Sequence, residues 1–344
     1  MKKHLLKGFL LVGLLCALFE GNAQDIHFSQ YNAAPLQLNP ALAGLNACDY
    51  RVYTDFRLQW PTISDGYTYR TLAAGADMAI GKVTKFNSYA GLGLSFSSDQ
   101  AGAINYSWNR VNLTFAYHFM LNAKGTMAIS AGLQGSFNNQ SIDASKATFD
   151  ANYFGLPGEN FGRTNLMYGD AGLGAMYSAQ FRHNVEFYSG FALDHVNQPK
   201  ISFYPSGQGG SINDNDRLYM KITFHGGMSI PMSKRVSLLP NYAVFIQGPS
   251  NEFDLGCSIK TVLDNNATSQ TTAILFGAQY RGLLDAAIFS ARLDYKGFSG
   301  GLSYDMNISK LLPASKSVGA PEITLVYQGC MRKKPHPGHC PEMF

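Results

Sequence analysis

Apolar residues alternate with small or polar residues along most of the chain. In the clearest stretch, 110–119, the apolar positions are Val111, Leu113, Phe115, Tyr117 and Phe119. The same alternation recurs at 91–97, 127–137 and 302–309. Successive side chains of a strand point to opposite faces, whereas a helix would spread such an apolar set around its axis. The pattern therefore predicts β-strands with one apolar and one polar face.

The same period of two predicts fourteen strands. They are expected at 50–60, 69–80, 88–98, 109–119, 126–137, 167–181, 185–194, 218–230, 235–247, 253–263, 271–281, 285–295, 299–309 and 321–328. Many of them run about 10 residues, the length that a tilted strand needs to cross a bilayer, whereas soluble strands average about five or six. An even number is typical of single-chain bacterial barrels whose two ends face the periplasm.

The predicted connections alternate in length. They are short at 182–184, 231–234 and 296–298, and longest at 138–166 and 195–217. Outer-membrane barrels have short periplasmic turns and longer extracellular loops. We therefore expect periplasmic termini, although the connections 248–252 and 282–284 are short on the side of the long loops.

Composition favours a membrane barrel over a soluble β-sandwich, which would also alternate. Charged residues make up 15% of the chain, against about 25% in soluble domains. Aromatic residues reach 13% and there are 35 glycines, yet no stretch after Gln24 approaches the ~20 apolar residues of a membrane helix. The net charge of +4 is too small and too scattered to indicate a nucleic-acid partner. The expected fold is an all-β, antiparallel transmembrane barrel in contact with outer-membrane lipid.

The start of the chain has the order of regions of a secretory signal peptide. Three lysines up to Lys7 precede an apolar run at 8–19, and small residues lead to Ala23. We predict a signal peptide over 1–23, cut before Gln24, and hence export to the outer membrane. The alternative interpretation is a buried N-terminal helix.

Four cysteines follow the predicted signal peptide: Cys48, Cys257, Cys330 and Cys340. An exported protein meets an oxidising compartment, so disulfides are allowed, and four cysteines have three full pairings between which the sequence does not choose. A bond between Cys330 and Cys340 would close the shortest loop and is the candidate disulfide. With His336 and His339 these two could form a Cys2His2 set, but the spacing matches no zinc module.

No motif indicates catalysis. The chain has no G-x-S-x-G nucleophile elbow, and the glycines at 91–93 precede no helix that could hold a phosphate. His118 is expected to face the lumen as a solvated residue. We therefore expect a protein that is not an enzyme and has no cofactor or bound metal.

A set of short motifs, in order along the chain, resembles the PorP/SprF family. The opening pair is Phe28-Ser29-Gln30-Tyr31 and Leu38-Asn39-Pro40-Ala41-Leu42-Ala43-Gly44, which is similar to F-S-Q-Y followed by N-P-A-Y-A-G. Later motifs are Arg57-Leu58-Gln59-Trp60, Gly91-Leu92-Gly93-Leu94 with Asp99 and Gly102, Ala116-Tyr117-His118, Ile142-Asp143 with Lys146, Glu322-Ile323-Thr324-Leu325, and Cys340-Pro341 with Phe344. The resemblance covers essentially the whole chain after the predicted signal.

The resemblance implies an outer-membrane component of the type IX secretion system of Bacteroidetes. Members of that family are linked to secretion or surface attachment of particular cargo proteins, including gliding adhesins, and to periplasmic components that reach peptidoglycan. The alternative function, suggested by the polar inner face, is a diffusion porin or small-molecule channel.

The predicted organisation has four parts: a signal peptide at 1–23, a periplasmic or plug segment at 24–48, the barrel at 49–328 and a periplasmic tail at 329–344. The candidate partner-binding or plug residues are Phe28, Gln30, Tyr31, Asn39, Pro40, Ala41 and Gly44. Because Asn-Pro favours a turn, the alternative interpretation of this motif is a purely structural turn that leads into the first strand.

Overall fold

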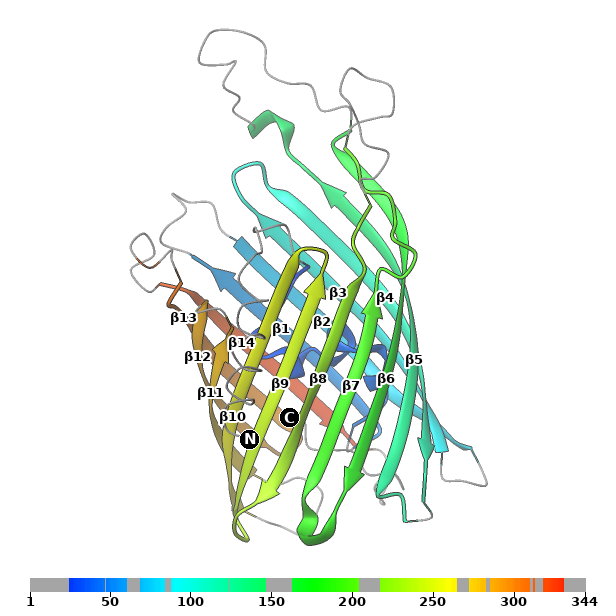
Figure 1. Cartoon of the computed structure of the whole chain (residues 1–344), viewed down its shortest axis with the longest axis vertical. Helices are drawn as coiled ribbons and strands as arrows, with labels where there is room; N and C mark the ends of the chain where they lie inside the picture. The colour runs from blue at the N-terminus through cyan, green and yellow to red at the C-terminus, as the bar shows by residue number, and fades with distance from the viewer. Residues whose placement is uncertain are drawn as a thin grey trace, which may run out of the picture.

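In the computed structural model, fourteen strands close into one antiparallel barrel (Figure 1). The structure describes residues 25–46, 48–60, 69–83, 88–122, 124–146, 163–203, 217–264, 272–282, 285–309, 312 and 318–330. The strands are β1 (Tyr50–Gln59), β2 (Tyr69–Val83), β3 (Ser88–Ala101), β4 (Tyr106–Met120), β5 (Met127–Ser141), β6 (Asn165–Gln180), β7 (Glu186–Asp194), β8 (Lys221–Pro231), β9 (Val236–Gln247), β10 (Ser250–Asp264), β11 (Thr272–Arg281), β12 (Ala286–Tyr295), β13 (Phe298–Asn307) and β14 (Ala320–Gly329). Each pairs with its sequence neighbours, and β1 pairs with β14.

The predicted fold class is confirmed, and each predicted strand overlaps one observed strand. The largest differences are at strand ends: β4 begins at Tyr106 and β5 ends at Ser141. The alternation of apolar residues stops where the strands leave the apolar band, but the backbone ladder continues through polar pairs such as Asn109 with Asn139. The pattern therefore located each strand but understated the length of the longest ones.

The two faces of the wall differ as the alternation predicts. On β4, Leu113 and Phe115 point outward and are exposed, while Asn112, Thr114 and His118 point inward and are buried. The outward face is apolar around the barrel, with residues such as Leu94, Leu133, Phe276, Leu302 and Leu325 exposed. Burying this band in lipid satisfies its apolar surface, and barrel closure leaves no unpaired strand edge there. No helix in the described part of the chain is long and apolar enough to cross a membrane.

The two ends of the barrel differ in their connections. One end, which we call the short-turn end, carries turns such as 232–235 and 296–297, and η4 (Arg182–Asn184) between β6 and β7. The other, the long-loop end, carries the connections 142–164 and 195–220. The asymmetry is not complete, because β3 and β4 are joined at the long-loop end by only 102–105.

The described part of the chain begins and ends on opposite sides of the barrel. Cys330 follows β14 at the short-turn end. Asp25 lies at the long-loop end, where its carboxylate contacts His195, the residue after β7. The two ends of the barrel wall do lie on one side, since Tyr50 at the start of β1 pairs with Gly329 at the end of β14. Residues 25–46 run through the barrel before β1 begins, and the expected periplasmic location of the two chain ends concerns residues outside the described ones.

The predicted disulfide is also corrected. Cys330 is bonded to Cys48, with a Cα–Cα distance of 4.5 Å, and the predicted partner Cys340 lies outside the described residues. The bond spans 282 residues of sequence, but closure of the barrel pairs Tyr50 with Gly329. Loop length was the wrong criterion because the register of β1 and β14 places these two cysteines beside each other.

A charge at the middle of the outer face should destabilise the barrel. We expect Leu113→Arg, in the middle of β4, to lower the free energy of unfolding by about 2–4 kcal/mol. The matched control is Leu263→Arg, one residue from the end of β10, with an expected loss of about 1 kcal/mol or less. Urea unfolding in lipid vesicles measures both values, and equal losses would contradict the membrane placement.

Candidate functional site: a plug in the barrel lumen

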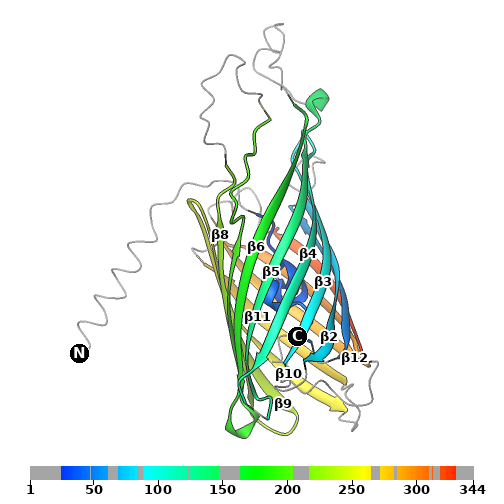
Figure 2. The ribbon, with the colours of Figure 1, turned by 90° about the vertical axis from the view of Figure 1, so that its right-hand side faces the viewer.

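Residues 25–46 lie inside the barrel, and we call them the plug (Figure 2). The plug contains η1 (Tyr31–Ala33), α2 (Pro35–Leu38) and η2 (Pro40–Leu42). Pro35 and Pro40 open α2 and η2, where a residue without an N–H is tolerated. The side chain of Asn39 accepts a 2.8 Å hydrogen bond from the backbone N–H of Ala41 and so caps η2. The turn predicted from Asn-Pro is thus a break between two short helices within the lumen.

The plug brings an apolar core into a lumen whose wall is largely polar. Two clusters of buried side chains join it to the wall. One contains Phe28, Ala33, Ala34, Leu36 and Ala43 of the plug with Tyr53, Ala73, Ala116 and Val326. The other contains Tyr31, Leu38, Ala41, Leu42 and Leu45 with Met176, Tyr188 and Ala243. Their burial gives the plug a hydrophobic stabilisation in addition to its polar contacts.

Glycines on the wall allow the plug backbone to approach closely. A Cβ at Gly132 on β5 would overlap Ala41 and Pro40, and one at Gly174 on β6 would overlap the side chain of Asn39. On β3, a Cβ at Gly91 would overlap the carbonyl of Ala43. These positions require glycine because any side chain would occupy the space of the plug backbone.

Two buried side chains of the wall and plug fix η2. The amide of Asn39 donates to the carbonyls of Ala175 (3.1 Å) and Phe191 (3.3 Å) and lies 3.0 Å from Nε2 of His225. His118 Nε2 lies 2.9 Å from the carbonyl of Ala43. Since a carbonyl only accepts, Nε2 carries the proton and donates. These contacts give the Asn39 amide and the Ala43 carbonyl buried hydrogen-bond partners within the protein.

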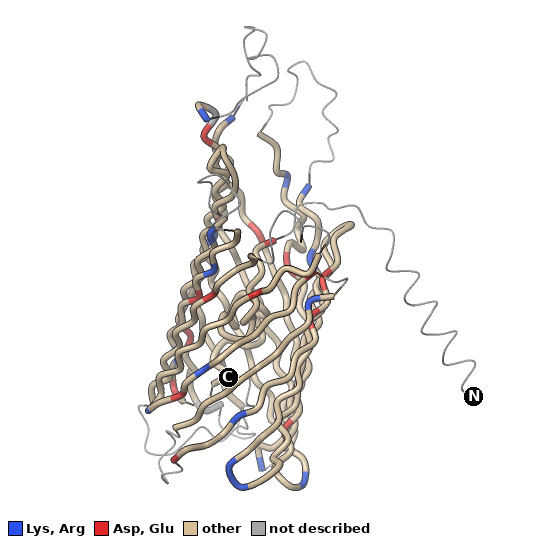
Figure 3. Tube along the Cα trace, turned by 90° about the vertical axis from the view of Figure 1, so that its left-hand side faces the viewer, with Lys and Arg blue, Asp and Glu red and all other residues tan. Residues whose placement is uncertain are grey.

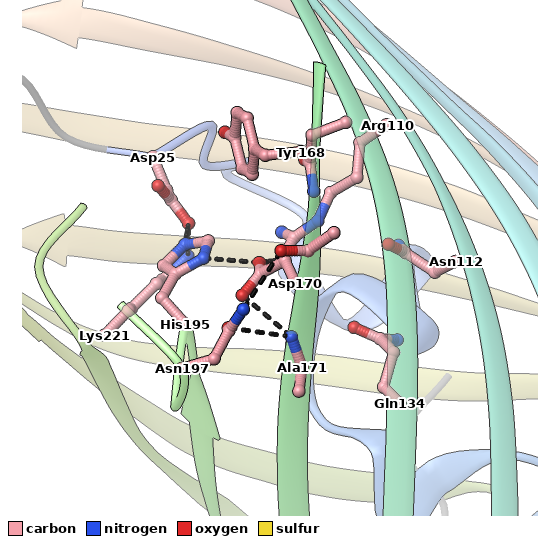
Figure 4. A network of polar contacts seen from close by, with 12 residues as sticks. Asp25, Arg110, Asn112, Gln134, Tyr168, Asp170, Ala171, His195, Asn197 and Lys221 are labelled. Atoms are coloured by element: carbon pink, nitrogen blue, oxygen red, sulfur yellow. Dashed lines mark hydrogen bonds and ion pairs between the residues drawn. The ribbon is translucent and has the colours of Figure 1, made fainter. Parts of the chain in front are cut away.

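At the long-loop end, Asp25 is held by a group of ionic contacts that we call the latch (Figure 4). His195 lies between two carboxylates, with Nε2 2.7 Å from Asp25 and Nδ1 2.6 Å from Asp170. Arg110 donates to the same oxygen of Asp170 at 2.9 Å. The Gln247 side chain donates to the other oxygen of Asp25 at 2.9 Å and accepts from the backbone N–H of Asp25 at 2.8 Å. Lys221 lies 3.9 Å from the Asp25 carboxylate.

The latch is charged at neutral pH. Burial by itself lowers the pKa of His195, but the carboxylates of Asp25 and Asp170 outweigh burial and raise the pKa to about 9. Burial likewise raises the pKa of Asp25, yet His195, Lys221 and Arg110 hold that pKa well below its ordinary value. The imidazolium therefore bridges two carboxylates, which offsets the unfavourable burial of all three charges.

A second network holds Ser29 and Gln30 in the lumen. The backbone N–H groups of Ser29 and Gln30 donate to the two oxygens of Glu322, at 2.8 and 2.6 Å. The hydroxyl of Ser29 donates to Asp305 at 2.7 Å and accepts from Arg57 at 2.7 Å. One carboxylate thus receives two backbone donors that would otherwise be buried without a partner.

At the short-turn end, Gly44 and Leu42 are tied to the wall. The backbone N–H of Gly44 donates to Asp77 at 2.7 Å, and Arg51 donates to both oxygens of Asp77 at 2.9 and 3.0 Å. Arg51 also donates to the carbonyl of Leu42 at 3.2 Å. Gly44 has a φ of +73°, which favours glycine where the plug turns towards Cys48.

The structure brings all seven predicted motif residues into the lumen. Phe28, Tyr31, Asn39, Pro40, Ala41 and Gly44 are buried, and Gln30 is half-buried. Tyr31 donates to Asn241 on β9 at 2.9 Å. The sequence left open whether this segment is periplasmic or lies in the lumen. In the structure, residues 25–46 lie in the lumen. In this conformation they contact the barrel itself.

Sequence reasoning did not single out the residues that hold the plug. Asp25, Asp170 and His195 were not among the predicted site residues. Arg57 and Glu322 appeared only as parts of the short motifs that resemble the family. The available signal was the strand pattern, since Asp170 and Glu322 occupy inward positions of strands. Among the described residues, no group of three or more His, Cys, Asp or Glu side chains is arranged to hold a metal ion.

The fold and the site together define a transmembrane β-barrel whose lumen is occupied by a segment preceding its first strand. Within that class, the chain belongs to the family of type IX secretion system membrane proteins PorP/SprF. The sequence profile of this family matches residues 20–327. The resemblance drawn from the ordered motifs is thereby confirmed.

Solved structures with a similar fold are outer-membrane barrels. The toluene transporter TbuX of Ralstonia pickettii matches with a TM-score of 0.50 at 10% identity, over 89% of this chain and 94% of that one. The toluene transporter TodX of Pseudomonas putida matches with a TM-score of 0.45 at 10% identity, over 90% and 95% of the two chains. At 10% identity the TbuX match indicates the fold alone. The sequence matches no curated protein.

Filling the space above Gly132 should displace the plug. We expect Gly132→Leu to open the lumen and to give steady ion conductance in a planar bilayer, where the wild-type protein gives almost none. Gly135→Leu is the matched control, because Gly135 lies on the same strand and a Cβ there meets nothing within 4 Å. If both variants stay closed, Gly132 does not support the plug; if the wild-type protein already conducts steadily, the plug does not seal the lumen.

The latch should weaken at alkaline pH. The pKa of His195 is raised from 6.5 to about 9, so its stabilisation is complete below pH 6.5 and is lost as the pH rises through about 9. The loss amounts to roughly 3 kcal/mol. Fluorescence-monitored thermal unfolding should show a falling midpoint across this range in the wild type but not in His195→Gln. The control His183→Gln changes an exposed turn residue and should behave like the wild type; a wild-type midpoint that does not change would contradict the latch.

Proposed function

We propose that this protein is an outer-membrane component of the type IX secretion system that binds, secretes or anchors specific exported cargo, of the gliding-adhesin type. The observation that carries the proposal is the family match, which spans residues 20–327 and so includes both the plug and the wall. A lipid-facing apolar band on a closed barrel supports the outer membrane as its location. A signal peptide at 1–23 would supply the export step, and these residues lie outside the described part of the chain.

The plug itself supports a shared role for the family. The motif residues Ser29, Asn39, Arg57, His118 and Glu322, which carry the family resemblance, all take part in plug contacts. They come from five separate parts of the sequence, and what they share is a location in the lumen. A sealed barrel therefore accounts for the ordered motifs better than a surface binding site would.

The contacts of the histidines support a role without catalysis. His118 Nδ1 lies 2.7 Å from the hydroxyl of Ser130, which is the nucleophile–base pairing of a hydrolase. Its other nitrogen, however, bonds to the Ala43 carbonyl instead of a carboxylate, and the residue is fully buried beneath the plug. A substrate would have to displace the plug to reach this pair.

A diffusion porin is the alternative function, and the plug argues against it. Side chains and backbone of the plug reach wall strands on several sides of the lumen, from Glu322 on β14 to Asn241 on β9. Moving the plug aside would require these buried hydrogen bonds and ion pairs to break. This arrangement fits regulated passage or anchoring better than free diffusion.

The short-turn end has the features expected of a surface for periplasmic partners. Its described turns carry exposed cations, namely Lys124, Arg182, Lys234, Arg235 and Lys296. Figure 3 shows Lys and Arg at the tips of these turns. Peptidoglycan-linked secretion components of acidic surface would be attracted to such a ring, while the cargo would meet the long-loop end.

Loss of the gene should remove particular surface proteins only. We expect deletion to leave general secretion intact and to deplete a subset of the surface proteome, measured by quantitative mass spectrometry of shaved cells. Complementation with Gly135→Leu should restore that subset, whereas Gly132→Leu should not. An unchanged surface proteome after deletion would contradict the cargo role.

A further inference from the structure

A cavity of about 200 Å³ lies at the long-loop end, beside the start of the plug. Gln59 and Trp60 border it from the end of β1, Asn307 from the end of β13 and Asp285 from the residue before β12. Arg57 and Arg281 also line it. The cavity differs from the latch, whose residues are absent from its lining, and the proposed secretion role makes no use of it.

The charges around this cavity disfavour an anionic ligand. The guanidinium groups of Arg57 and Arg281 are already paired with buried carboxylates. These are Asp305 at 2.8 and 3.0 Å, Glu322 at 3.6 Å, and Glu252 and Asp254 at 3.3 Å. Among the residues that line the cavity, Asp285 and Asp305 match the two guanidinium groups in number, and His27 lies 3.7 Å from Glu252. A phosphate or carboxylate entering here would find no unmatched guanidinium.

The hydrogen-bonding groups call for a ligand that both accepts and donates. The amide oxygen of Asn307 already accepts from Ser309, at 2.8 and 2.6 Å, so its NH2 group remains as a donor. Gln59 and Asp285 add acceptors. A simple ammonium ion, which only donates, would leave the Asn307 donor unmatched.

Trp60 gives the cavity an aromatic wall among these polar groups. The ring is fixed edge-on against Tyr69, with the ring centroids 5.4 Å apart. Indole offers an apolar surface next to polar neighbours. A sugar ring combines an apolar C–H face with hydroxyls that each donate and accept, and the volume is below the ~300 Å³ of drug-sized sites.

We propose that this cavity binds a single neutral sugar residue, such as the terminal unit of a surface glycan. Trp60 lies against the C–H face of the ring, the Asn307 amide donates to a hydroxyl oxygen, and Gln59 and Asp285 accept from hydroxyl hydrogens. Access is from the long-loop end, where the cavity borders the mouth of the barrel. The site is independent of the proposed cargo role and would hold even if that role were wrong.

Saturation-transfer NMR on the purified full-length barrel tests the proposal. The probes are the methyl glycosides of glucose, galactose, mannose and N-acetylglucosamine, with glucuronate as an anion and lysine methyl ester as a cation. We expect transfer to the ring protons of at least one neutral glycoside and none to the anion. Transfer to the lysine ester alone would replace the proposal with a cation site, and no transfer to any neutral glycoside would overturn it.

Variants separate recognition from folding. Trp60→Ala should abolish the transfer, and Gln59→Ala should raise the dissociation constant by about fivefold, as for one lost neutral hydrogen bond. Gln328→Ala is the matched control, because Gln328 also lies on a lumen-facing position but at the short-turn end. Unchanged binding in both Trp60→Ala and Gln59→Ala, or an equal loss in Gln328→Ala, would contradict the site.

Discussion

The close packing of the plug backbone on the glycines of the wall is the contact on which the rest of the site depends. A lumen of fourteen strands is wider than wall side chains alone fill. Gly91, Gly132 and Gly174 let η2 lie directly against β3, β5 and β6. Only at that separation do Asn39 and His118 reach their carbonyl partners. The seating of the plug is thus determined by three positions that lack a side chain.

The charged groups follow from the same placement. Once the plug is seated, it meets the wall at successive depths. The groups involved are the Asp25 carboxylate and the backbone N–H groups of Ser29, Gln30 and Gly44. Each meets a charged side chain of the wall, since a buried polar group without a partner is strongly unfavourable. The bond from Cys48 to Cys330 then ties the exit of the plug to the seam between β1 and β14. The latch at Asp25 weakens at moderately alkaline pH, as the pH rises through the His195 pKa of about 9.

The sequence predicted the wall well and the lumen poorly. Alternation is a local property, so Val111 to Phe119 revealed β4 without knowledge of its neighbours. The plug contacts are not local: Asp25 and His195 are 170 residues apart, and only strand register brings them together. The disulfide shows the same limit. Short-loop reasoning chose Cys340, although the predicted closure of the barrel, applied to Cys48 and Cys330, would have paired them.

The most direct test of a seated plug is hydrogen–deuterium exchange of residues 25–46 in the native barrel. Backbone amides such as those of Ala41 and Gly44 are buried and bonded to oxygens of the plug or the wall. The account predicts that they exchange as slowly as the amides of β4, with slow exchange lost in Gly132→Leu. Exchange at the rate of an unstructured peptide in the wild-type protein would contradict a plug held in the lumen.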